Sequence, residues 1–224
     1  MAGEAGSEDE HLGDVPGHQA GGVDAKKRTL GASERDERAR TEWRERVRAP
    51  DPKRLIFVDE CGSNISLSPL YARAPRGKRA VGSAPRNWGR NITLIASMSA
   101  TGMGEALTLE GATDTVAFEL YVERFPAPSL EAGQTVVLDN LSAHKSERVR
   151  QLIEQRGRHL LYLPSYSPDF NPIEQAFSKL KGRLRQAQAR TREGLEVAIS
   201  EAIAAITKSD AHSWFQHCDY QAHL

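Results

Sequence analysis

The segment from Leu163 to Glu174, which reads L-P-S-Y-S-P-D-F-N-P-I-E, constrains the fold more than any other part of the chain. It follows an apolar run at residues 160–163 and ends inside a predicted helix. Its three prolines exclude a regular helix or strand between these two points. The segment is therefore predicted to be a stiff loop that brings the carboxylate of Glu174, in the first helical turn, to a fixed place beside a strand end.

Two further carboxylates follow short apolar runs that we interpret as buried strands. Asp59 comes after residues 54–58, and Asp139 comes after residues 135–138. In α/β sheets, binding sites form at the carboxyl ends of central strands. Hard divalent cations such as Mg²⁺ prefer carboxylate oxygens. Three acids at such positions therefore predict a metal site.

The residue after Asp59 is a second acid, Glu60. Successive side chains of a strand point to opposite faces of the sheet. We therefore expect one of these two carboxylates to face the site and the other to face solvent, and the apolar run leaves both assignments open.

The order of the predicted elements indicates an α/β fold. The strands are expected at residues 54–58, 63–70, 91–98, 105–109, 135–138 and 159–163, and the helices at residues 113–125, after Ser146, from about 172, and at 191–206. On the helix at 113–125, the expected buried face comprises Ala117, Leu120, Tyr121 and Phe125. A three-strand antiparallel meander followed by β-α-β units predicts a mixed sheet with flanking helices.

The chain is predicted to divide into three parts. Residues 1–40 hold few large apolar residues among many Gly, Glu and Asp, and they cannot bury enough surface to offset the entropy of ordering. We expect them to form a disordered leader. In the charged segment that follows, Trp43 and Val47 are four residues apart, which is typical of a short helix. We assign residues 41–52 to a linker helix and residues 53–224 to the main domain.

Composition excludes several classes of protein. The chain has 30 basic and 30 acidic residues, so its formal net charge indicates no partner. Its two cysteines, Cys61 and Cys218, lack C-x-x-C spacing, which argues against a disulfide scaffold or a structural zinc site and fits a reducing cytosol. No apolar run approaches the roughly 18 residues of a membrane span. We expect a cytoplasmic protein without membrane contact.

Basic residues are concentrated in two stripes that contain no acid. The first stripe comprises Arg73, Arg76, Lys78, Arg79, Arg86 and Arg90, with Trp88 among them; the second comprises Lys179, Lys181, Arg183, Arg185, Arg190 and Arg192. Such stripes are typical of a surface that binds a polyanion. An ordinary solvated loop and helix face would show the same charges.

Each candidate residue also has a structural interpretation. Asn171, Pro172 and Glu174 form an N-cap, a first-turn proline and a capping-box glutamate, which is enough to start a helix without catalysis. Asp139 followed by Asn140 is also typical of a turn. His144 could orient water or phosphate, but we interpret it as a surface histidine.

Three blocks carry a family resemblance. They are L-I-F-V-D-E at 55–60, V-V-L-D-N-L-S-A-H-K at 136–145, and L-Y-L-P-S-Y-S-P-D-F-N-P-I-E-Q-A-F-S-K-L-K at 161–181. They resemble the acid-bearing blocks of DDE transposases, and in particular of the bacterial insertion-sequence transposases related to the mariner superfamily. The likeness covers about residues 40–220, and the third block is its most specific part. The 34 residues between Asp139 and Glu174 agree with the spacing that the resemblance leads one to expect.

The resemblance implies an RNase H-like fold for residues 53–224, with Asp59, Asp139 and Glu174 as catalytic residues that hold two Mg²⁺ or Mn²⁺ ions. It implies cleavage of transposon DNA ends and strand transfer to target DNA. The first stripe with Trp88, and Lys179, Lys181 and Arg183 of the second, become candidate DNA contacts. We expect a nucleoid-associated protein that forms a homodimer when it brings two DNA ends together.

Relatives of this kind usually carry helix-turn-helix domains ahead of the catalytic domain, and residues 1–40 show no recognition helix. Two alternatives to an active transposase domain therefore stay open. One is an inactive truncated remnant that only binds DNA or inhibits a full-length relative. The other is an RNase H-like nuclease that cuts without joining.

Overall fold

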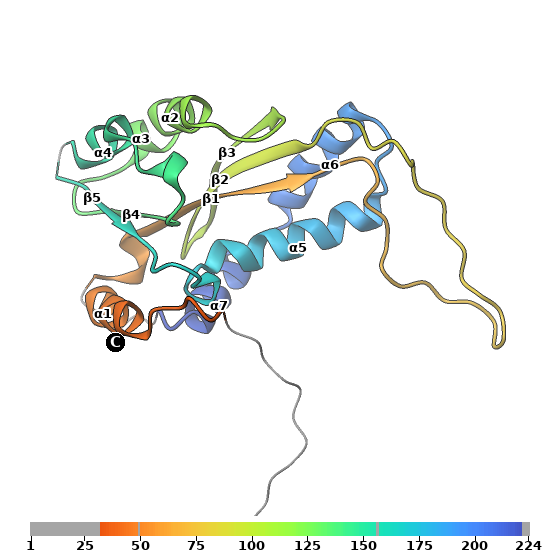
Figure 1. Ribbon diagram of the computed structural model, residues 1–224, viewed down its shortest axis with the longest axis horizontal. Helices are drawn as coiled ribbons and strands as arrows, with labels where there is room; N and C mark the ends of the chain where they lie inside the picture. Colours follow the sequence, from red (N-terminus) through yellow and green to blue (C-terminus); the bar gives the residue numbers. More distant parts are fainter. Residues whose placement is uncertain (1–31, 49, 156, 221–224) are drawn as a thin grey trace, which may run out of the picture. The chain divides into compact units, whose positions relative to one another are not determined.

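The computed structural model describes residues 32–48, 50–155 and 157–220, and these residues contain one five-stranded mixed sheet (Figure 1). The strands are β1 (Leu55–Ser63), β2 (Ile92–Ser99), β3 (Gly102–Glu110), β4 (Thr135–Leu138) and β5 (His159–Tyr162). Their order across the sheet is β3-β2-β1-β4-β5. The strands β1, β2 and β3 form an antiparallel meander, and β4 and β5 run parallel to β1. The predicted mixed α/β sheet is confirmed.

One predicted strand is wrong, and another is longer than expected. Residues 64–70 leave the sheet, and the antiparallel partner of β1 is instead β2, with Ser63 opposite Ile92. The strand β1 does not end at Asp59, because β2 pairs with it for its whole second half. Its pairing with β4, however, stops at Val58. Asp59 therefore lies where one parallel neighbour of the strand has ended.

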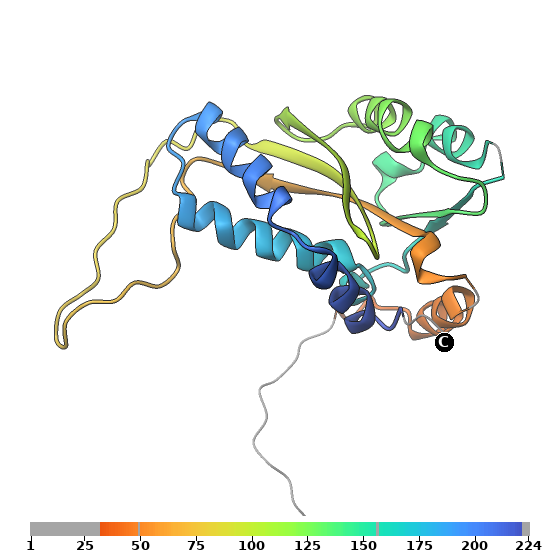
Figure 2. The same ribbon diagram turned by 180° about the vertical axis from the view of Figure 1, so that it is seen from behind.

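Helices cover both faces of the sheet (Figures 1 and 2). The helices on one face are α2 (Thr115–Arg124), α3 (Pro126–Ser129) and α4 (Glu147–Glu154), and those on the other are α5 (Pro172–Ala187), α6 (Arg192–Ala204) and α7 (Lys208–His217). Each face has its own apolar core: Val58, Ile95 and Leu138 point toward the first group, and Phe57, Leu94 and Met98 toward the second. Alternate residues of the central strands supply both cores, as their nearly continuous apolar sequence predicts.

The buried face of α2 differs from the predicted one. Its buried residues are Phe118, Tyr121 and Val122, whereas Leu120 is exposed. The buried face of α2 is rotated relative to the predicted one because Phe118, which the prediction left out, buries a larger apolar area than Leu120 would. The helix expected after Ser146 is confirmed as α4, and the Ser146 hydroxyl caps it by accepting a hydrogen bond from the backbone N–H of Val149.

The first described helix, α1 (Glu37–Arg48), packs on the rest of the domain. It begins before residue 41, where the prediction placed the linker helix, so residues 37–40 are helical rather than part of a leader. Trp43 is buried, and its indole N–H donates to the Tyr220 hydroxyl at 3.1 Å. Residues 1–31 of the expected leader lie outside the described residues.

Between β1 and β2 the chain runs away from the sheet in a long loop, residues 64–91 (Figures 1 and 2). Arg190, in the short connection between α5 and α6, holds the base of this loop. Its guanidinium donates to the carbonyls of Ile65 and Leu67 at 2.8 Å each, and to the carbonyl of Ser83 on the returning leg at 3.3 Å. Among the described residues, no helix is long and apolar enough to cross a lipid bilayer.

Candidate active site

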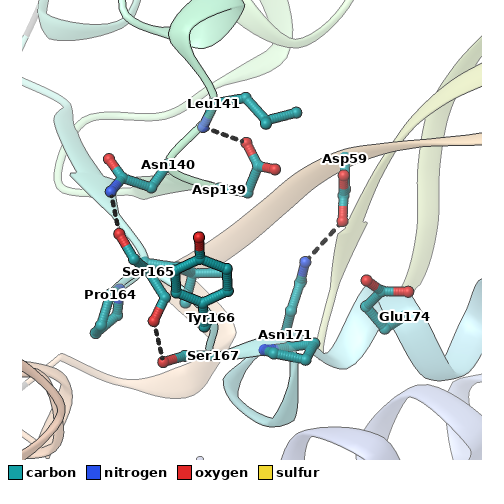
Figure 3. Close-up of a pocket in the computed structure, with 12 residues that line it drawn as sticks. Asp59, Asp139, Asn140, Leu141, Pro164, Ser165, Tyr166, Ser167, Asn171 and Glu174 are labelled. Carbon is teal, nitrogen blue, oxygen red and sulfur yellow. Dashed lines mark hydrogen bonds between the residues drawn. The ribbon is translucent and has the colours of Figure 1, made fainter. Parts of the chain in front are cut away.

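A pocket of about 400 Å³ lies beside the ends of β4 and β5 and the start of α5. Its lining includes Asp59 from β1, Asp139 directly after β4, and Glu174 from the first turn of α5 (Figure 3). The parallel register explains the first two: Val58 is opposite Leu138, so the residues that follow them are neighbours. The structure thus brings all three acids singled out from the sequence to one pocket.

Asp59 is the most buried of the three acids, with 8% of its surface exposed. Its Oδ2 accepts a hydrogen bond from Asn171 Nδ2 at 2.8 Å, and its Oδ1 accepts one from the Glu60 N–H at 2.7 Å. Burial raises the pKa of Asp59, the Glu60 N–H lowers it, and the negative charges of Asp139 and Glu174 raise it further, to about 7. Burial first, and the neighbouring carboxylates second, therefore disfavour a bare negative charge on Asp59, which a proton or a cation would offset.

Asn171 does not make the helix cap that the sequence predicts. It occupies the N-cap position of α5 before Pro172, but its side chain accepts no hydrogen bond from the first turn. Its amide is instead directed at Asp59 (Figure 3). A buried carboxylate without donors is costlier than an N-terminal turn without a side-chain cap, which explains this choice. The side chain of Glu174 forms no capping box, and this residue is exposed on the pocket side of α5.

Glu60 and His144 correct two further predictions. Glu60 points to the opposite face of β1 from Asp59, but there it meets His144 rather than solvent, with Nε2 of the ring 3.0 Å from Glu60 Oε1. His144 is not a surface residue: its exposed fraction is 0%. Its Nδ1 lies 2.5 Å from Oδ1 of Asp139. Burial lowers the pKa of His144, but Asp139 and Glu60 outweigh it and raise the pKa to about 9.

The stiff loop predicted from its prolines forms one wall of the pocket. Asn140 Nδ2 donates to Ser165 Oγ at 2.6 Å, which ties the end of β4 to this loop. Tyr166, with a backbone φ of 55°, is exposed at the pocket, where its ring lies in the foreground of Figure 3. Left-handed backbone is uncommon for a residue with a Cβ and is found at functional sites. The short 3-10 turn Pro168–Phe170 then leads into α5.

The two basic stripes differ in how many of their side chains already form ion pairs or hydrogen bonds within the protein. In the first stripe, along the loop 64–91, the basic residues and Trp88 are exposed, and Arg90 forms an ion pair with Glu110 at 3.0 Å. In the second, Lys179 is paired with Asp210 at 2.6 Å. Arg190 holds the loop base, whereas Lys181 and Arg183 lie on the same helix as Glu174.

The pocket fits a hard divalent cation by the chemistry of its donors. Within the described part of the chain, no three His, Cys, Asp or Glu side chains are already arranged as a closed ion site. The three acids nevertheless offer only carboxylate oxygens, the ligands that Mg²⁺ and Mn²⁺ prefer. The pKa of Asp59 is raised chiefly by burial and further by the charges of Asp139 and Glu174, and a bound cation would offset both effects.

A mixed sheet of this topology, with three acids at one pocket, is the architecture of an RNase H-like catalytic domain. Solved structures confirm the fold. The Mos1 transposase paired-end complex with left transposon end has a TM-score of 0.70 at 18% identity, covering 88% of this chain and 64% of that chain. Mos1 paired-end complexes solved with Mn and with Mg give TM-scores of 0.67 and 0.66 at 16% and 15% identity, covering 89% and 90% of this chain and 64% and 66% of those chains.

Residues 54–196 match the DDE superfamily endonuclease family, and the chain belongs to this family. Its domain is of the Tc1/mariner transposase type. The Tc1 transposase of Caenorhabditis elegans is 26% identical over 181 residues, which are 77% of this chain and 64% of that protein. The Tcb1 transposase of Caenorhabditis briggsae is 28% identical over 168 residues, or 69% and 62%. The chain thus spans less than two thirds of the length of these relatives.

Proposed function

We propose that this chain is the catalytic domain of a DNA transposase, which cleaves transposon ends and transfers the freed strand to target DNA. The observation that carries the proposal is the convergence of Asp59, Asp139 and Glu174 on one pocket in a DDE endonuclease fold. These three residues would act as the catalytic residues and would hold two Mg²⁺ or Mn²⁺ ions. The bound ions would neutralise charge on the phosphate and lower the pKa of the attacking water or hydroxyl.

The reaction consists of two phosphoryl transfers of the same kind. In the first, water attacks the scissile phosphodiester and the P–O3′ bond breaks, which leaves a free 3′-hydroxyl on the transposon end. In the second, that hydroxyl attacks a target phosphodiester, and a target 3′-hydroxyl leaves. The protein forms no covalent intermediate in this scheme. Its contribution is to position the strands and to offset negative charge.

The residues of the pocket divide this work. Asn171 fixes the Asp59 carboxylate through a hydrogen bond, so that its orientation is set before any DNA is bound. The loop around Ser165 and Tyr166 closes the pocket on the side of β5 and restricts the path by which a strand can enter. A site that is organised in advance needs less rearrangement when the phosphate arrives.

DNA is proposed to follow the two basic stripes toward the pocket. The exposed residues of the first stripe are Arg73, Arg76, Lys78, Arg79, Arg86 and Arg90, with Trp88. On α5 the candidate contacts are Arg183, which is exposed, and Lys181, which is half-buried. Lys179, also a candidate contact, would have to give up its ion pair with Asp210. Phosphate contacts of this kind bind DNA without sequence preference and weaken as salt is added.

Several wider inferences rest on the resemblance of the three sequence blocks alone. We infer a homodimer when two ends are held together, action at the nucleoid, and membership of the bacterial insertion-sequence branch. We also keep the division of the chain into a leader, a linker helix and a catalytic domain, with the linker helix now taken as α1.

The experiment is cleavage of a labelled duplex that carries the repeats flanking the gene, with Mg²⁺ or Mn²⁺, beside an unrelated duplex. The matched control is Asp139→Asn, which keeps the shape of the side chain but removes its charge. We expect metal-dependent nicking that the substitution abolishes, and joined products when a target plasmid is added. Nicking without joining would indicate a simple nuclease. DNA binding without nicking, unchanged by Asp139→Asn, would refute catalysis and indicate an inactive remnant.

A further inference from the structure

His144 joins the candidate site from the far face of the sheet. Its ring lies between two carboxylates from separate parts of the chain: Glu60 of β1 is 3.0 Å from Nε2, and Asp139, directly after β4, is 2.5 Å from Nδ1. Glu60 is 84 residues away from His144 along the chain. The ring therefore bridges β1 and the segment that follows β4.

The imidazole is held on all sides. It packs against the Phe118 ring of α2, with the ring centroids 4.0 Å apart. The Tyr162 hydroxyl donates to the backbone carbonyl of His144 at 3.2 Å, which fixes the turn Ser142–His144 to β5. Burying a polar ring is costly unless its nitrogens have partners, and each nitrogen here lies within ion-pair distance of a carboxylate. The position of the ring is therefore set by packing and by charge together.

We propose that His144, itself oriented by Glu60, is a positioning residue that fixes the carboxylate of Asp139 for metal binding. This inference rests on the proposed function. Asp139 uses one oxygen, Oδ1, for both inward contacts: it accepts from the Leu141 N–H at 3.0 Å and lies against His144. Among the described residues no hydrogen bond to Oδ2 is found, so this second oxygen is left for the pocket.

The arrangement resembles the outer shell of known metal sites, where groups behind the ligands set their orientation. Substituting such groups typically costs about 10–100-fold in metal affinity. Asp139 follows the last residue of β4 and is held by no strand pairing of its own. Without His144 its carboxylate could rotate about its side-chain bonds, and an ion site tolerates only a small displacement.

Two variants remove the contact in different ways. His144→Phe keeps the stacking on Phe118 but has no ring nitrogens, and Glu60→Leu removes the carboxylate that orients the ring. Glu60→Gln is the conservative variant, because its amide oxygen can still accept from the imidazole. Val149→Ala is the matched control: Val149 is fully buried in the same core but belongs to α4 and is not part of the pocket lining.

The measurement is direct binding of Mn²⁺ without DNA, followed by loss of the free-ion electron paramagnetic resonance signal. It is made at a temperature where circular dichroism shows every variant folded. We expect His144→Phe and Glu60→Leu to weaken Mn²⁺ binding by about 10-fold or more. Glu60→Gln should stay near the unsubstituted protein, and Val149→Ala should lower the melting temperature without changing the affinity. As a second readout, the Mn²⁺ concentration for half-maximal nicking should rise in the first two variants.

The inference is overturned if His144→Phe and Glu60→Leu bind Mn²⁺ as tightly as the unsubstituted protein. It is equally overturned if Val149→Ala weakens binding as much as they do, since the effect would then be one of stability alone. An unsubstituted protein that nicks DNA with Mn²⁺ would leave the proposed function intact in either case. If that protein neither binds Mn²⁺ nor nicks DNA, the proposed function fails, and the inference fails with it.

Discussion

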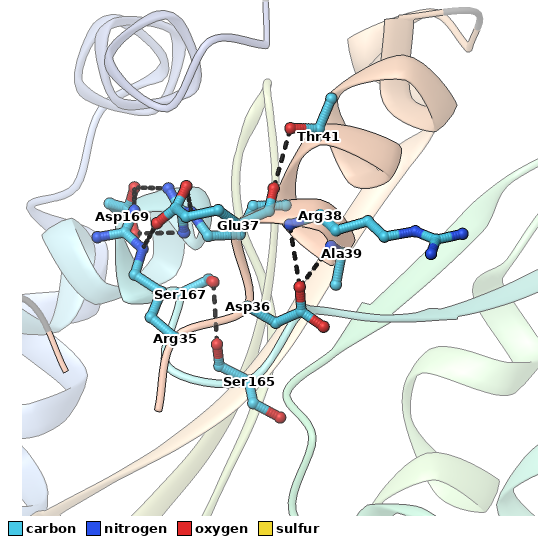
Figure 4. A network of polar contacts seen from close by, with 10 residues as sticks. Arg35, Asp36, Glu37, Arg38, Ala39, Thr41, Ser165, Ser167 and Asp169 are labelled. Atoms are coloured by element: carbon cyan, nitrogen blue, oxygen red, sulfur yellow. Dashed lines mark hydrogen bonds and ion pairs between the residues drawn. The ribbon is translucent and has the colours of Figure 1, made fainter. Parts of the chain in front are cut away.

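The ion pair between Arg40 and Asp169 allows a quantitative test of how α1 is joined to the turn Pro168–Phe170, which precedes α5. Arg40 Nη1 and Nη2 donate to the two oxygens of Asp169 at 3.1 and 2.6 Å, and the guanidinium stacks 4.0 Å above the Phe170 ring. Figure 4 shows Asp169 beside Arg35 and Glu37, at the start of α1. The Arg40 side chain is 1% exposed, whereas that of Asp169 is 50% exposed. The two partners therefore differ in what each loses when the other is removed.

Asp169→Asn leaves a guanidinium that is buried and has lost its nearest negative charge. The remaining carboxylate near it is that of Glu37 at 3.6 Å, and its side chain is 70% exposed. Stranding one charge of a buried pair costs about 3–5 kcal/mol, and the asparagine oxygen, which still accepts one hydrogen bond, places the expected loss near the lower end. We expect Asp169→Asn to lower the free energy of unfolding by about 3 kcal/mol.

Arg40→Met removes the charge but keeps an apolar side chain against Phe170. The Asp169 carboxylate that remains is half exposed, so water and Arg35, at 3.1 Å, can solvate it. The free energy of unfolding should then fall by only about 1 kcal/mol. The hydrogen bonds to Asp169 are lost, but the cost of burying the guanidinium is lost with them. The double variant should resemble Arg40→Met, because neither charge is left buried alone.

Urea unfolding of the four proteins, followed by circular dichroism, gives the comparison at constant m-value. The reasoning is refuted if Arg40→Met destabilises as much as Asp169→Asn, or if the two losses simply add in the double variant. Partial burial raises the pKa of Asp169, but the hydrogen bonds and charge of Arg40 outweigh it and leave the pKa lowered. This stabilisation is therefore present above the ordinary carboxylate pKa and is lost as the pH falls through the folded-state value, so the advantage over Arg40→Met should shrink in acid.

Three further predictions concern the pocket and the DNA path. Asn171→Leu removes a donor from the buried Asp59 carboxylate and should weaken Mn²⁺ binding by about 10-fold, whereas Gln175→Leu, at the neighbouring helix turn, should not; equal effects would argue against a role for the amide. Arg190→Met should release the base of the loop 64–91, seen as faster tryptic cleavage within that loop while the midpoint of urea unfolding changes little. Unchanged cleavage would show that the four hydrogen bonds from its guanidinium to the loop are dispensable. Replacing Arg73, Arg76 and Lys78 by Gln should make the negative slope of log K against log salt for duplex binding less steep by about 3, if all three contact phosphates. An unchanged slope would exclude these three residues of the first stripe as DNA contacts.

Local patterns were sufficient to predict the sheet and the three acids. Apolar runs of four or five residues predicted β1, β4 and β5, because parallel strands that are buried on both faces need apolar side chains at nearly every position. The acid after each of the first two runs, and Glu174 after the proline loop, then followed from where strand ends meet. The strand predicted at 63–70 was wrong because its alternation of apolar and polar residues is weak. Arg190, more than a hundred residues later, holds that segment in a loop instead.

The sequence by itself determined which residues could form strands, caps and the stiff loop, since these depend on neighbours within a few positions. Only the tertiary structure decided what lies on the far side of each strand. Alternation assigns Asp59 and Glu60 to opposite faces, but it does not say that His144 covers the second one. Arg40 likewise reads as one more charge on a polar helix until Asp169, 129 residues away, is brought against it. Burial and pairing are properties of contacts between distant segments, and no local pattern encodes them.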